Sequence, residues 1–118
     1  MRTLTIGKNL VANTATIIHT IPIGYYAKWN LLYVLNGTGS TKNITVQWYD
    51  ASEDDTINIL YEYSVSSKEF FKIDGGAYIV LEEGDYIEMT SEASSTFSII
   101  TTFEQEKKAS VLSFQKGN

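Results

Sequence analysis

The fold of this chain is limited most by its high content of β-branched and aromatic residues, many of which recur at every second position. Isoleucine, valine, threonine and the aromatic residues occupy 47 of 118 positions, against seven alanines and eight leucines. Apolar side chains stand at every second position in 44–48 and at most second positions in 97–103, so each segment has one face for a core. No segment sustains the i, i+3, i+4, i+7 apolar pattern of an amphipathic helix. The chain is therefore expected to form strands.

Turn-forming residues separate these runs at short, even intervals, which is typical of an antiparallel sandwich or barrel. The breaks include Gly7-Lys8-Asn9, and Asn-Gly and Asp-Gly pairs are expected to supply positive φ angles for tight turns. We predict an all-β fold: a single antiparallel β-sandwich, jelly-roll-like, of eight or nine short strands with extended N- and C-terminal arms. The expected strands are 3–6, 14–21, 27–36, 42–50, 56–63, 68–73, 77–81, 86–92 and 96–105.

Charge divides the chain into a body and a tail. Residues 1–106 carry six basic and fourteen acidic side chains, a net charge of −8, whereas residues 107–118 carry three lysines and no acid, a net charge of +3. We predict an N-terminal strand or arm over 1–12, a sandwich domain over 13–106 and a basic, apolar tail over 107–118. The tail is expected to dock on a neighbouring protein, although a last strand or a frayed end remains the alternative.

Composition excludes several classes of function. The chain has no cysteine, so disulfides, thiolate zinc sites and thiol nucleophiles are absent, and its single histidine rules out histidine-rich metal sites. The overall charge of −5 is the wrong sign for gripping a phosphate backbone, so no nucleic acid partner is predicted. No run approaches the roughly 18 apolar residues of a membrane helix, so no membrane partner is predicted.

Catalytic motifs are missing as well. The sequence has no G-x-S-x-G elbow, P-loop, dinucleotide-binding glycine motif or H-E-x-x-H, so we predict no enzyme activity, catalytic residue or cofactor. His19 lies within an expected strand and is interpreted as a surface or packed histidine. The acidic run at 50–55 lacks the alternating spacing of a calcium loop and is interpreted as a solvated loop, with a metal site as the weaker alternative. The acids at 82–85 are interpreted as turn residues that blunt aggregation at a sheet rim.

Two consecutive tyrosines point to a contact surface. In an extended segment Tyr25 and Tyr26 face opposite ways, so at least one should lie outside the core. An exposed tyrosine of this kind is more often a protein contact than a sugar platform. Together with the two termini, these rings give the set of residues that we predict to make protein contacts: Met1, Arg2, Leu4, Tyr25, Tyr26, Lys107, Lys108, Val111, Leu112 and Phe114.

The order of several segments resembles the small β-sandwich proteins of tailed bacteriophage virions. In such proteins a T-V-P-x-G turn leads into a strand that ends at Asn, and an L-x-x-G-D-x-I turn precedes the last hairpin. Here Ile21 and Ile23 replace the commoner residues of the first turn, while Gly24 and Gly84 are expected to give backbone freedom and Pro22 to fix φ. The resembling segments are 20–24, 27–36, 44–50, 81–87 and 96–104.

The resemblance implies a structural role without catalytic residues. It implies a virion accessory protein that decorates or cements the capsid exterior, with copies of itself, a trimer included, and the major capsid protein among its partners. A tail or head-fibre attachment protein of the same fold is one alternative. A carbohydrate-binding module, in which exposed aromatic rings stack on sugars, is another.

Overall fold

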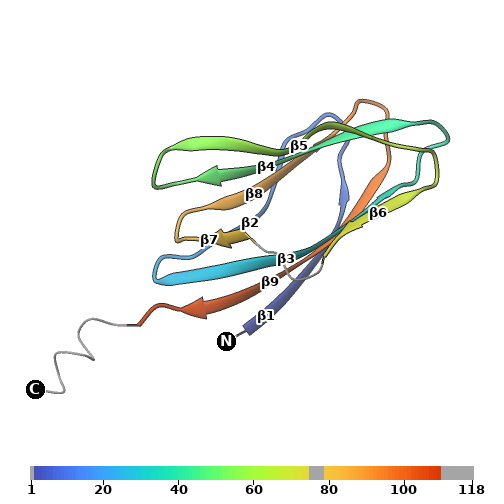
Figure 1. Cartoon of the computed structure of the whole chain (residues 1–118). Helices are drawn as coiled ribbons and strands as arrows, with labels where there is room; N and C mark the ends of the chain where they lie inside the picture. The colour runs from blue at the N-terminus through green and yellow to red at the C-terminus, as the bar shows by residue number, and fades with distance from the viewer. Residues whose placement is uncertain (1, 75–78, 110–118) are drawn as a thin grey trace, which may run out of the picture.

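The computed structural model describes residues 2–74 and 79–109, which form nine strands (Figure 1). No helix among these residues is long and apolar enough to cross a membrane. The strands are β1 (Arg2–Leu10), β2 (Thr16–Thr20), β3 (Tyr25–Asn36), β4 (Lys42–Asp50), β5 (Asp55–Val65), β6 (Phe70–Ile73), β7 (Ile79–Leu81), β8 (Tyr86–Ser91) and β9 (Phe97–Lys107).

The strands build two antiparallel sheets that face each other, as Figure 1 shows. One sheet has the order β1-β9-β3-β6, and the short β7 also pairs with β3, next to the stretch that β6 occupies. The other sheet has the order β2-β8-β4-β5. This is the strand order of a jelly roll, in which an antiparallel ribbon is wound so that its strands are shared between two sheets. The predicted all-β, antiparallel sandwich of eight or nine strands is confirmed.

The core lies between the sheets and is built by the predicted alternation. Along β9 the side chains of Phe97, Ile99, Thr101 and Phe103 are buried, while those between them are partly or fully exposed. The other buried apolar side chains come from both sheets, so burial of apolar area holds the two layers together. They are Leu10, Ile18, Ile21, Ala27, Trp29, Leu32, Val34, Ile44, Val46, Val65, Leu81, Ile87 and Met89.

The predicted break at Gly7-Lys8-Asn9 is wrong. β1 continues through these residues to Leu10, and it pairs with β9 in unbroken register from Arg2, opposite Gln105, to Leu10, opposite Phe97. Pairing with a complete neighbouring strand outweighs the local turn preference of glycine and asparagine. Residues 2–10 are therefore a full edge strand of the sheet.

The expected tight turn at Asn36-Gly37 is also wrong. Asn36 is fully buried as the last residue of β3, and its side-chain amide donates to the carbonyl oxygens of Ser40 (3.0 Å) and Val65 (2.8 Å). Its side-chain oxygen accepts the backbone N–H of Thr38 at 2.9 Å. Asn36 thus ties two loops together, and positive φ at glycine occurs, within the described ranges, at Gly24 (89°) and Gly84 (87°).

Candidate interaction surfaces

The residues weighed as chemical groups have structural roles. The ring of His19, on β2, packs 5.0 Å from that of Phe103, on β9, and its Nε2 lies 2.8 Å from Oε1 of Gln105, so it is a packed histidine that links the two sheets. In the acidic loop, Asp50 accepts hydrogen bonds from the backbone and hydroxyl of the nearby Ser52. No group of three metal-ligating side chains occurs among the described residues.

Asp85 differs from the rim charge that the sequence suggested. The residue is 1% exposed, and its carboxylate accepts three hydrogen bonds, from Trp48 Nε1 (3.1 Å), the N–H of Ala51 (2.9 Å) and the N–H of Glu82 (2.9 Å). The Cβ of a side chain added at Gly84 would lie 3.0 Å from that of Ala51. The β4–β5 and β7–β8 loops are therefore fastened to each other at one end of the sandwich.

The start of the tail is held at this same end. The backbone N–H of Lys108 donates to the carbonyl oxygen of Gly24 at 2.8 Å, and its Nζ lies 3.2 Å from Oε1 of Glu83. The N–H of Gly24 also donates to Glu83 at 3.1 Å. These two groups, the N–H of Gly24 first and then the Lys108 ammonium, lower the pKa of Glu83. Ile23, beside this anchor, is 86% exposed.

The predicted contact residues that the structure describes lie at one end of one sheet, at the start of β1, the start of β3 and the end of β9. Tyr25 packs against the core, whereas the hydroxyl of Tyr26 donates to Glu106 at 2.5 Å, so the two rings do face opposite ways. This hydrogen bond raises the pKa of Tyr26. Arg2 is exposed at the start of β1, and Leu4 is partly buried against the core.

Lys107 is exposed and pairs with Tyr25 in the sheet, and Lys108 makes the contacts given above. The remaining predicted contacts lie outside the described residues; they are Met1, Val111, Leu112 and Phe114. The structure thus brings Tyr25, Lys107 and Lys108 together, and the start of β1 lies beside them, because Arg2 pairs with Gln105 on β9.

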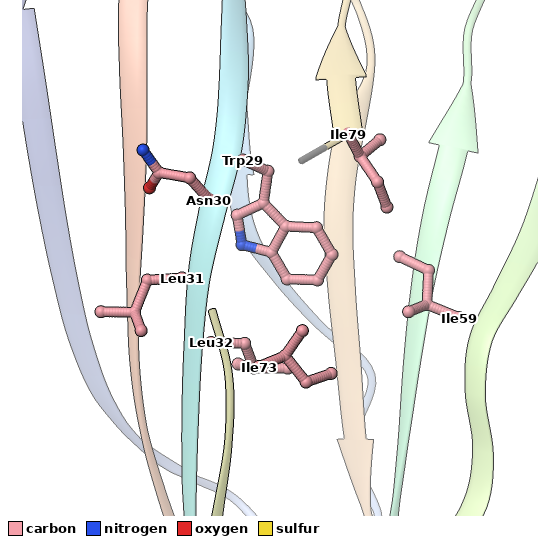
Figure 2. A pocket seen from close by; sticks show the side chains of 7 residues that line it. All are labelled: Trp29, Asn30, Leu31, Leu32, Ile59, Ile73 and Ile79. Carbon is pink, nitrogen blue, oxygen red and sulfur yellow. The ribbon is translucent and has the colours of Figure 1, made fainter. Parts of the chain in front are cut away.

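A pocket opens between the sheets on the side where β5 and β6 are the edge strands. It has a volume of about 160 Å³. Figure 2 shows the Trp29 ring facing Ile79 of β7 and Ile59 of β5, with Leu32 and Ile73 below them. Asn30 and Leu31 complete the lining from the other side of β3. We call it the inter-sheet pocket; its lining is apolar except for Asn30.

A buried hydrogen-bond pair fixes the wall of the inter-sheet pocket. The indole N–H of Trp29 donates to Oγ1 of Thr101 at 2.5 Å, and the Thr101 hydroxyl donates to the carbonyl oxygen of Leu31 at 2.7 Å. The register between β3 and β9 shifts between Trp29 and Leu31, so the threonine spans an irregular point of the ladder. The indole is thereby oriented before anything enters the pocket.

Exposed apolar side chains gather around the same side. Ten large apolar side chains are exposed in the described part of the chain, and five of them lie on β5 and β6. We call these the edge cluster: Ile57, Tyr61, Tyr63, Phe70 and Ile73. The Tyr63 and Phe71 rings meet edge to face at 5.0 Å, which brings β5 and β6 side by side across the sandwich. Phe70 stacks on Tyr33 at 5.3 Å, on the face of β6 opposite to Phe71 and Ile73, so the edge cluster extends over both faces of that strand.

Sequence reasoning missed the inter-sheet pocket and most of the edge cluster. One signal was present: the segment 56–63 has apolar residues on both of its faces, which a strand covered on one side does not need. That β5 and β6 are edges of different sheets on one side depends on the winding of the whole chain.

Comparisons with known proteins show which solved structures have a similar fold. No protein-family model and no curated protein matches the sequence. The chain is similar to a solved structure of Bacillus endospore appendages, described as disulfide-linked pili, with 18% identity, a TM-score of 0.50, and 92% of this chain and 87% of that chain covered. Because this chain has no cysteine, such disulfide links have no counterpart here.

Two further solved structures are less similar. The globular domain of zebrafish complement 1qA has 10% identity and a TM-score of 0.46, with 85% of this chain and 94% of that chain covered. A pentameric capsid protein from metagenomic phage sequences has 19% identity and a TM-score of 0.46, with 88% and 62% covered. At such identities a likeness concerns the fold and leaves function open.

Proposed function

We propose that this chain is a non-enzymatic structural protein of a bacteriophage virion, which decorates or cements the capsid exterior. It acts through contacts with copies of itself and with other virion proteins such as the major capsid protein. The observation that carries the proposal is the edge cluster: apolar side chains, Tyr61 at 66% and Phe70 at 57% exposed, concentrated on one side of a jelly roll. Such a surface favours protein association. The sequence resemblance to phage β-sandwich proteins supports the virion as the location of this protein.

The test locates the chain on the particle. Cryo-microscopy of the virion, combined with quantitative mass spectrometry, should find this jelly roll on the outside of the capsid in hundreds of copies. A few copies at the tail or at a head fibre would replace the proposal by the attachment protein of the same fold. Absence from purified particles would overturn both.

A carbohydrate-binding role has one observation in its favour, the exposed Tyr61 ring. Sugar-binding sites use such rings as stacking platforms, but they also need polar groups that fix the hydroxyls. A glycan array with the wild-type chain and a Tyr61→Ala variant decides this alternative. Binding that the variant loses would support it, and no binding by the wild type would remove it.

A further inference from the structure

The inter-sheet pocket has the size and lining for one aromatic side chain. Its volume of about 160 Å³ is close to that of an apolar protein cavity, about 150 Å³ and lined by similar side chains, that stays dry and binds benzene. The oriented ring of Trp29 forms one wall, and Ile59, Ile73 and Ile79 form the others (Figure 2). A phenyl ring in this place would exchange water for apolar contacts on several sides.

The chain itself carries a segment of matching chemistry. Residues 110–118 lie outside the described residues, and their sequence is S-V-L-S-F-Q-K-G-N. In an extended segment Leu112 and Phe114 share one face, so a ring entering a pocket brings a leucine against its rim. This segment carries one lysine, Lys116, and no acid, so its charge of +1 is opposite in sign to the −8 of residues 1–106.

A tail that turns back directly after β9 would not bring Phe114 level with the pocket of its own chain. Trp29 pairs with Phe103 and Tyr25 pairs with Lys107, so Lys108 lies five residues, about 17 Å, beyond the level of the pocket. A reversal of the chain takes about four residues. A tail turning back directly after Lys108 would then return by only two residues, about 7 Å, at Phe114.

We propose that Phe114 of one copy inserts into the inter-sheet pocket of a second copy, with Leu112 against the edge cluster. This inference rests on the self-association contained in the proposed function and names the site that performs it. Each copy then offers one tail and one pocket, which makes the contact heterologous. A heterologous contact closes into a ring or continues as a chain of copies.

Two variants remove the two halves of the contact. Ile73→Asp places a charge in the pocket lining at a position already 45% exposed, so folding should survive it. Its matched control is Val80→Asp, because Val80 is also 45% exposed on the same sheet but does not line the pocket. The tail variant is Leu112→Ser with Phe114→Ser, and its control is Gln115→Ser. Circular dichroism verifies the fold of each.

The decisive experiment is a mixture. Analytical ultracentrifugation should show the wild type and both controls associating, and each contact variant weakened at least about tenfold, as burial of one phenyl ring predicts. Mixing the pocket variant with the tail variant leaves one intact tail and one intact pocket, so it should give a heterodimer and nothing larger. A monomeric wild type, a tail variant that associates as well as wild type, or a mixture that stays monomeric would overturn the inference.

The outcome is independent of where the protein resides. A heterodimer from the mixture would uphold the tail-to-pocket contact even if the chain were missing from virions. Capsid decoration without any heterodimer would leave the proposed function standing and discard this contact.

Discussion

Replacing Asp85 should test how the tail-bearing end of the sandwich is held together. A hydrogen bond to a charged group contributes about 1.5–3 kcal/mol, and Asp85 accepts three, two of them from backbone N–H groups that its loss leaves without this acceptor. Because such contributions are not additive, we expect Asp85→Ala to lower the free energy of unfolding by about 3–5 kcal/mol. Out of a typical 5–15 kcal/mol, this is a large share.

The isosteric variant makes the reasoning sharper. Oδ2 of Asp85 accepts from Trp48 and Glu82, and Oδ1 accepts from Ala51. An asparagine with its oxygen in the Oδ2 position keeps the hydrogen bonds from Trp48 and Glu82, but it turns its NH₂ group toward the N–H of Ala51, where two donors meet. We therefore expect Asp85→Asn to lower the free energy of unfolding by about half as much as Asp85→Ala.

Urea denaturation followed by tryptophan fluorescence measures both costs, with Glu82→Gln as the control expected to stay within about 0.5 kcal/mol of wild type. An alanine variant that loses less than about 1 kcal/mol would refute the reasoning. Equal losses for alanine and asparagine would refute the assignment of the two oxygens.

Two further predictions concern the tail anchor and the pocket wall. The N–H of Gly24 and the Lys108 ammonium lower the pKa of Glu83 below its usual 4.5 in the folded protein. The ionised Glu83 carboxylate therefore stabilises the folded state above pH 4.5, and this contribution is lost as the pH falls through the lower pKa of the folded state. An NMR titration of the Glu83 carboxyl should show the lowered pKa. The variant Lys108→Met should raise the titration midpoint of Glu83, and a midpoint equal to that of the wild type would contradict the role of Lys108. Thr101→Val removes the acceptor of the buried Trp29 indole and should cost about 2 kcal/mol in urea denaturation, against less than 1 kcal/mol for Thr101→Ser.

The sequence was a good guide wherever a structure depends on local alternation. The period-two pattern of 97–103 predicted the buried and exposed faces of β9, and Gly24 and Gly84 have the positive φ angles expected of their turns. These features follow from neighbouring residues alone, because side-chain direction alternates along a strand and only glycine adopts such φ angles without strain.

The features that alternation could not predict depend on residues far apart in the chain. From the sequence Asp85 is expected to be an exposed turn residue, but it is buried because Trp48 on β4 and Ala51 in the loop after β4 donate hydrogen bonds to it. Gly7 is expected from the sequence to end a strand, but its pairing with β9 keeps it within β1. The inter-sheet pocket likewise joins residues of β3, β5, β6 and β7, so no local segment contains its signal.

The place of β9 has a mechanical consequence. The tail continues directly from this strand, which is paired with β1 at nine positions and with β3 at eleven. The backbone hydrogen bonds of antiparallel strands run perpendicular to the strands. A force along β9 therefore acts on all of these bonds at once, in shear, and does not break them one after another. A neighbour that grips the tail therefore pulls on the whole sheet, and the tail can carry tension between copies without unravelling the fold from which it leaves.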